Sequence, residues 1–212
     1  MEQQTLENFG EIPILHKNKF KKMTTATQIE LSEPQKAAVE AGKNIAIPAS
    51  WEEFIDFLPT THYKAEFVNS EIIIMGLAKL IHEWLVGQII WILKNMYHNS
   101  LNTLVMSSNL GVLNLESSFF NPDVTVVKGK PIFYKNSEAI ITNPYLVVEI
   151  LSEGTASYDW ESKLPRYQQI ESIQEIVIVH PVQKSITVLS RTTEKKVWMM
   201  TIYDQPTETV FF

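Results

Sequence analysis

Tyr145-Leu146-Val147-Val148-Glu149-Ile150-Leu151 is an almost continuous apolar run that contains a single carboxylate. A run of this length and composition is typical of a strand that is buried on both faces at the centre of a sheet. A carboxylate near the end of such a strand is costly to desolvate unless it is paired, protonated or bound to a cation. We therefore predict a central strand here, with Glu149 in a functional site.

The segments around this strand carry strand and helix patterns. The hairpin pattern comes first, with Glu66-Phe67-Val68 and Ile72-Ile73-Ile74 on either side of Asn69-Ser70. Apolar side chains then recur at helical spacing over residues 81–96, which predicts a long helix that packs on the sheet. Further strands are predicted at residues 104–106, 111–115, 124–127, 176–179, 186–189 and 197–203, the last two paired antiparallel. This order of elements predicts an α/β (α+β) fold, with a mixed central β-sheet flanked by helices.

The domain organisation follows from where this patterning begins. Residues 1–48 show no sustained period, which predicts an N-terminal extension that is either mobile or draped over the core. Ser50-Trp51-Glu52-Glu53 then has the spacing of a capping box and predicts the start of a short helix. We therefore expect one domain over residues 49–212.

Composition narrows the class of protein. With 212 residues, of which 45% are hydrophobic, the chain can bury one substantial core. The absence of cysteine excludes thiolate catalysis, cysteine-ligated zinc and iron–sulfur clusters. No secretory leader or membrane-spanning run is visible, so we expect a cytoplasmic protein without a membrane partner. The net charge of −6 argues against avid nonspecific binding to nucleic acid, but active-site carboxylates and a bound metal make the local charge more important.

Three acidic residues and one lysine are the candidate catalytic groups: Glu66, Asp123, Glu149 and Lys163. Phosphodiester hydrolysis uses carboxylates to hold a divalent cation, and an ammonium group to position the attacking water or stabilise the transition state. The set therefore predicts a metal-dependent nuclease.

Three of these residues, and a further candidate, also have a purely structural interpretation. Asp123 follows a proline, where aspartate is a common turn residue. Lys163 is four residues from Asp159, so the two could form an ion pair on a helix surface. Glu66 is equally consistent with an exposed hairpin charge. His82, near the start of the helix predicted over residues 81–96, is on its own more typical of a polar-face or packing residue.

Taken together, the motifs resemble the Uma2-type endonucleases of the restriction-endonuclease-like PD-(D/E)xK superfamily. The resemblance covers about residues 51–191 and implies a mixed-sheet core of αβββαβ topology with an acidic site at one edge. It rests on Glu66, Pro122-Asp123, Val147-Val148-Glu149-Ile150-Leu151-Ser152, Asp159-x-x-x-Lys163-x-Pro165-x-Tyr167 and Gln174-Glu175-Ile176-Val177-Ile178-Val179.

The resemblance also implies a role for each site residue. Asp123 matches the aspartate of the PD element and Glu149 matches the second acidic ligand. Leu151 stands where the wider superfamily has its lysine, and Lys163 matches the lysine that this family carries on the next helix. We therefore expect one Mg²⁺ or Mn²⁺ between Asp123 and Glu149, with the backbone carbonyl of Ile150 as a further ligand.

Three more residues complete the expected site. Glu66 matches the glutamate of the first hairpin and is expected to hold the metal through water or to occupy a second metal position. His82, which matches a histidine at the start of the long helix, and Asp159 are accessory candidates. The resemblance further implies a nucleic acid substrate, expected to be DNA, and a homodimer.

Two alternatives from other classes remain open. The chain could be a catalytically inactive member of the fold that binds nucleic acid or protein. It could instead be a homo-oligomeric assembly domain, since its apolar C-terminal residues, including Val210-Phe211-Phe212, could pair with another copy.

Overall fold

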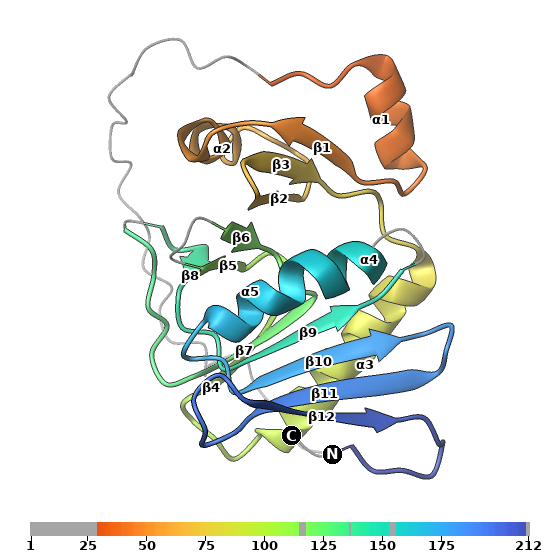
Figure 1. Cartoon of the computed structure of the whole chain (residues 1–212), viewed down its shortest axis with the longest axis vertical. Coiled ribbons are helices and arrows are strands. Elements are labelled where there is room, and N and C mark those ends of the chain that lie inside the picture. Colours follow the sequence, from red (N-terminus) through yellow and green to blue (C-terminus); the bar gives the residue numbers. More distant parts are fainter. Residues whose placement is uncertain (1–28, 115–117, 136, 153–155, 211–212) are drawn as a thin grey trace, which may run out of the picture.

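The computed structural model describes residues 29–114, 118–135, 137–152 and 156–210 (Figure 1). Its strands form two six-stranded sheets. In spatial order, the first sheet consists of β1 (Ile45–Pro48), β3 (Glu71–Ile74), β2 (Ala65–Val68), β6 (Ser118–Phe120), β5 (Gly111–Asn114) and β8 (Ile140–Ile141). The second consists of β12 (Trp198–Tyr203), β11 (Ser185–Arg191), β10 (Glu175–His180), β9 (Leu146–Ile150), β7 (Val124–Lys128) and β4 (Thr103–Ser107).

The predicted fold class is confirmed, although the strands divide between two sheets rather than one. Both sheets are mixed, because β9 and β10 pair in parallel in the second sheet and β5 and β8 pair in parallel in the first. β12 pairs antiparallel with β11, as the pattern at residues 197–203 predicts. The strands β6 and β8 were not predicted, and with three and two residues they are too short for a sequence period to be recognised.

Helices cover both faces of the second sheet (Figure 1). α3 (Leu80–Met96) lies on one face, where Val86 and Leu93 share a core with Leu146 and Val148 of β9. The opposite face is covered by a nearly continuous helical segment made of α4 (Ala156–Tyr158), the π-helical turn η2 (Asp159–Lys163) and α5 (Leu164–Gln169). β9 is therefore buried along its whole length, as the apolar run predicts.

The chain passes from the first sheet to the second between β6 and β7, over residues 121–123. The first sheet also supplies the β2–β3 hairpin, whose turn residues Asn69 and Ser70 have φ values of 53° and 59°. Positive φ at both turn positions is typical of a tight two-residue hairpin, in agreement with the sequence pattern. The crossing segment and the hairpin bring carboxylates of both sheets to one place.

Two helices pack on the first sheet, at the end of the molecule away from β12 (Figure 1). They are α1 (Glu33–Glu40) and α2 (Trp51–Phe57), and α2 begins with the predicted capping box. The Glu53 N–H donates to Ser50 Oγ at 3.2 Å, and the Ser50 N–H donates to Glu53 Oε2 at 2.7 Å. Residues 1–28 lie outside the described residues, so a domain boundary at residue 49 stays a prediction. Among the described helices, none is both long and apolar enough to cross a membrane.

Candidate active site

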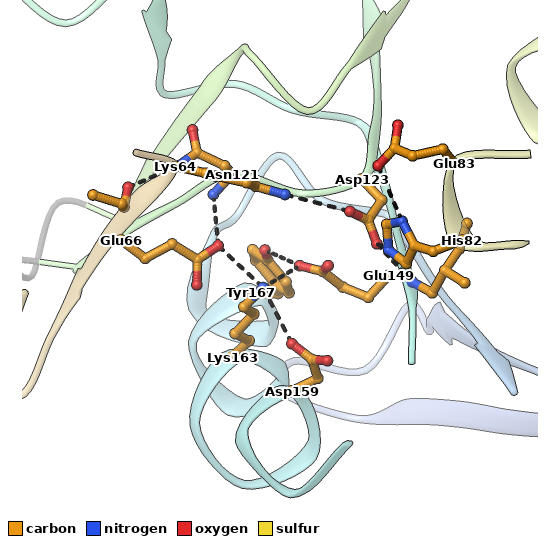
Figure 2. Close-up of polar contacts among 12 residues, drawn as sticks. Lys64, Glu66, His82, Glu83, Asn121, Asp123, Glu149, Asp159, Lys163 and Tyr167 are labelled. Atoms are coloured by element: carbon orange, nitrogen blue, oxygen red, sulfur yellow. Dashed lines mark hydrogen bonds and ion pairs between the residues drawn. The ribbon is translucent and has the colours of Figure 1, made fainter. Parts of the chain in front are cut away.

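Lys163 lies at the centre of the candidate site (Figure 2). Its Nζ is 3.0 Å from Glu66 Oε1, 3.2 Å from Glu149 Oε1 and 3.1 Å from Asp159 Oδ1. The three carboxylates come from β2, β9 and η2, and each of these side chains is at most 4% exposed. The Lys163–Asp159 pair predicted from the i,i+4 spacing is present, but it is buried rather than on a helix surface.

Helix geometry explains how Lys163 reaches this position. Pro165 has no N–H to donate and is tolerated only in the first turn of a helix, where it stands in α5. The preceding turn, Asp159–Lys163, is π-helical, and π turns are frequently found at functional sites. Both ends of this turn are buried, which directs Asp159 and Lys163 toward β9.

Hydrogen bonds from two neighbouring residues reach two of the buried carboxylates, Glu149 and Glu66. Tyr167 Oη, on α5, donates to Glu149 Oε1 at 2.6 Å. The Asn121 N–H donates to Glu66 Oε1 at 3.0 Å, and Asn121 Nδ2 donates to the Ala65 carbonyl at 2.8 Å. Asn121 therefore ties the crossing segment to β2 and fixes the position of Glu66.

Asp123 is held by a second group of contacts on the other side of the site (Figure 2). Its Oδ2 accepts a hydrogen bond from the Ile150 N–H at 2.9 Å and lies 3.0 Å from His82 Nε2. Its Oδ1 lies 3.4 Å from Lys64 Nζ. Ile150 thus contacts Asp123 through its N–H group.

Strand register makes Asp123 and Glu149 neighbours. β7 and β9 pair antiparallel with Val124 opposite Val148, so Asp123 and Glu149 stand one position further along the two strands. Side chains at facing positions on adjacent strands are close enough to interact. The crossing segment before β7 and the end of β9 therefore bring the PD aspartate beside the strand glutamate.

The pKa values of Lys163 and Glu149 are both raised above their ordinary values. Burial works to lower the pKa of Lys163, but the charges of Asp159, Glu149 and Glu66 outweigh it and raise that pKa well above its usual value. Burial raises the pKa of Glu149 to about 8; Lys163 opposes this shift, while Asp159, Asp123 and Glu66 add to it. Lys163 therefore keeps its positive charge. The ionised form of Glu149 is unfavourable unless positive charge lies nearby.

The pKa of Asp123 shifts in the opposite direction to that of Glu149. Burial works to raise the pKa of Asp123, yet the hydrogen bond with His82 and the charges of Lys64, His82 and Lys163 outweigh it and lower the pKa to about 2. The same hydrogen bond raises the pKa of His82. Neighbouring carboxylates whose pKa values are driven apart are a frequent property of catalytic sites.

The donor set suits a hard divalent cation. Four buried carboxylates (Glu66, Asp123, Glu149 and Asp159) face two lysine ammonium groups and one imidazole, so once Glu149 is ionised negative charge is in excess even when His82 is protonated. Within the described ranges, no group of three or more His, Asp or Glu side chains is arranged around a common metal position. Mg²⁺ does not require one, because proteins commonly hold it through one or two carboxylates and leave water on the remaining positions.

The structure brings all of the predicted site residues into two adjoining groups. Glu66, Glu149 and Asp159 surround Lys163, whereas His82 contacts Asp123. Lys64 and Asn121, which were not predicted, contact Asp123 and Glu66. Tyr167, which the resemblance includes without a role, contacts Glu149. Sequence spacing carries no signal for these partners, because their contacts with Asp123, Glu66 and Glu149 join segments 18 to 59 residues apart.

Comparisons with known proteins place the chain in a class of restriction-endonuclease-like proteins. The Uma2 family model, described as "Putative restriction endonuclease", matches residues 51–210, well over half of the chain. The chain therefore belongs to the Uma2 family, which confirms the resemblance seen in its motifs.

Two similar proteins come from cyanobacteria. An "uncharacterized protein sll1609" from Synechocystis sp. is 32% identical over 117 residues, which are 55% of this chain and 66% of that protein. The chain thus spans slightly less than two thirds of this relative. A crystal structure described as a "putative nuclease belonging to DUF820" from Anabaena variabilis has a TM-score of 0.64 at 18% identity, covering 78% of this chain and 89% of the other. At that level of identity the match shows the shared fold.

Proposed function

We propose that this protein is a metal-dependent endonuclease that hydrolyses phosphodiester bonds in DNA. The observation that carries the proposal is the buried contact of Lys163 with Glu149, beside Asp123 and in a site whose carboxylates outnumber its cationic groups. Burying that many carboxylates is costly for a purely structural role, whereas a divalent cation neutralises the surplus. Family membership supports the same reaction class.

Asp123 and Glu149 are the proposed ligands for Mg²⁺ or Mn²⁺. Both are carboxylates on adjacent strands, and hard divalent cations prefer oxygen donors. The Ile150 carbonyl is proposed as a further ligand and Glu66 as a contact through water. When bound, the metal supplies Lewis acidity and lowers the pKa of coordinated water.

Lys163 is proposed to position the attacking water and to stabilise negative charge that develops on the phosphate. Its raised pKa supports a charge-stabilising role rather than that of a general base. Glu66, Glu149 and Asp159 hold the ammonium group in place, so it is oriented before substrate arrives.

Substrate is proposed to approach from the side of Lys64 and His82. These side chains are 32% and 17% exposed, while those of Glu66, Asp123, Glu149, Asp159 and Lys163 are at most 6% exposed. A lysine ammonium group and a histidine with a raised pKa at this edge suit a phosphate group. Lys128 on β7 is already engaged, since its Nζ lies 3.6 Å from the centre of the Tyr145 ring. The sequence also has four lysines within residues 17–22, which lie outside the described residues.

The proposal is tested by nicking of supercoiled plasmid DNA with Mg²⁺ or Mn²⁺. We expect cleavage that EDTA abolishes and that Glu149→Gln or Lys163→Met lowers at least about a hundredfold, the usual effect of removing a group that stabilises the transition state. Glu52→Gln and Lys43→Met are matched controls, because both side chains are exposed outside the site. Equal activity of wild type and Glu149→Gln would refute the proposed role of Glu149.

A catalytically inactive nucleic-acid-binding module is the second candidate. It is favoured by the contacts that already engage both proposed ligands, Asp123 with His82 and Glu149 with Lys163 and Tyr167. This function predicts DNA binding that weakens with salt, is unaffected by EDTA and is accompanied by no cleavage. Binding and cleavage measured on the same preparation separate the two candidates.

A further inference from the structure

The outer face of α3 is rich in large apolar side chains that the described residues leave exposed. Its inner face packs on the second sheet through Val86 and Leu93. Its outer face exposes large apolar side chains: Leu80 (87% exposed), Ile81 (54%), Trp84 (56%), Trp91 (65%), Ile92 (49%) and Met96 (46%). An exposed apolar patch of this size commonly marks an interaction site, so this face is suited to a partner.

Gly87 indicates what kind of partner fits. It lies in the middle of α3, where glycine destabilises a helix relative to alanine, and a Cβ added there would have no atom within 4 Å. Nothing in the described part of the chain therefore requires a glycine. Leu80, Trp84, Gly87 and Trp91 follow a 4-3-4 spacing, the seam along which one helix packs against another. A residue without a side chain at the centre of such a seam lets a second backbone approach closely.

We propose that the partner is a second copy of this chain, with the two α3 helices antiparallel and crossing about a two-fold axis near Gly87 and Gln88. The seam is self-complementary about this point, because Trp84 precedes Gly87 by three residues and Trp91 follows Gln88 by three. The two-fold axis therefore places Trp84 of one copy opposite Trp91 of the other, as an isologous interface requires. It also brings the Lys94 end of one helix to the Glu83 end of the other, so the terminal charges are complementary.

The exposed area is sufficient for a dimer. The six outward apolar side chains expose roughly 700 Å² in total, close to the ~800 Å² that each partner buries in a standard interface. Nucleic acid is a poorer match for this face, because phosphate binding depends on many lysine and arginine residues. α3 carries only Lys94, with Lys79 at its N-cap.

Analytical ultracentrifugation of the full chain at micromolar concentration tests the proposal. We expect a dimer whose dissociation constant rises at least about thirtyfold in Trp91→Glu, the effect of losing a hot-spot aromatic residue. Gly87→Arg is a second, independent variant: the monomer has room for the side chain and gains a better helix former, but the arginine would separate the two helices. We therefore expect it to keep or raise the melting temperature of the monomer while weakening association. Leu101→Glu, at a position that is 99% exposed after α3, is the control and should remain dimeric.

Two results would overturn the proposal. If the wild-type chain is monomeric at 100 µM, a second copy does not bind this face. In that case, loss of DNA binding by Trp91→Glu would assign the face to nucleic acid. A dimer that persists in both Trp91→Glu and Gly87→Arg would place the interface elsewhere, with the edge strand β12 and its exposed Met199, Met200 and Ile202 as the next surface to test. Loss of the dimer in both variants, with folded monomers, supports the α3 interface.

Discussion

Lys163→Met would remove the only ammonium group within 4 Å of Glu66, Glu149 and Asp159 among the described contacts. Methionine retains much of the volume, so the main change is the loss of positive charge beside three buried carboxylates. Breaking a buried ion pair by removing one partner costs about 3–5 kcal/mol. Because the total stability of a domain is typically about 5–15 kcal/mol, we expect a large decrease in the free energy of unfolding.

Urea denaturation of the metal-free protein in EDTA at pH 8 measures this effect. At about 2–4 °C per kcal/mol for a domain of this size, the melting temperature should also fall by roughly 10 °C. Lys64→Met is the matched control: its Nζ is 3.4 Å from Asp123, but its side chain is 32% exposed. An ion pair at such a partly exposed position contributes about 1 kcal/mol or less.

The double variant Lys163→Met/Glu149→Gln distinguishes loss of charge pairing from loss of packing. If unpaired negative charge causes the destabilisation, removing one carboxylate should recover at least about 1 kcal/mol relative to the sum of the single effects. The reasoning is refuted if Lys163→Met lowers the free energy of unfolding by less than about 1 kcal/mol. It is also refuted if the effects of the two substitutions on that free energy are additive.

Three further predictions concern pH, metal and Tyr167. Because the folded-state pKa of Glu149 is raised to about 8 from 4.5, the folded protein binds more protons than the unfolded chain between these values, so metal-free stability should fall as pH rises from about 4.5 to 8. Urea midpoints measured across this range give the slope of stability against pH, and Glu149→Gln should flatten this slope. An unchanged slope in that variant argues against a raised pKa at Glu149. At pH 8, saturating Mg²⁺ should raise the melting temperature of wild type and of Glu52→Gln but not of Glu149→Gln, and equal shifts in all three would mean that the metal binds elsewhere. Tyr167→Phe should destabilise the protein by about 1.5–3 kcal/mol, since it removes a hydrogen bond to a buried carboxylate, and a change below 0.5 kcal/mol in denaturant titration would show that this bond is energetically unimportant.

Local patterns in the sequence were sufficient for much of the fold. The apolar run at residues 145–151, the alternation around Asn69-Ser70 and the helical period over residues 81–96 correspond to β9, the β2–β3 hairpin and α3. Each of these elements is long enough, or has sufficiently distinctive turn residues, for its own period to be recognised. The division into two sheets was not predictable in this way, because the short strands β6 and β8 are defined by their pairing partners.

The site was predictable in its residues but not in its contacts. A lone carboxylate in a buried strand indicates Glu149, and the family motif indicates Asp123 and Lys163. The sequence could not show that Lys163 contacts three carboxylates at once, because this depends on the π turn before Pro165 and on Glu66 from the other sheet. The contact of Ile150 with Asp123 through its N–H likewise depends on strand register rather than on residue type.

Crystals soaked in Mn²⁺ and measured at the manganese absorption edge provide the most direct test of the proposed metal site. The account predicts one anomalous peak between Asp123 and Glu149, with carboxylate oxygens at about 2.1–2.2 Å and Lys163 still in contact with Glu149. No such peak in a Glu149→Gln crystal soaked in the same way would support the assignment. An anomalous peak beside other residues would contradict the assignment. The absence of any peak between Asp123 and Glu149 at saturating Mn²⁺ would also contradict it.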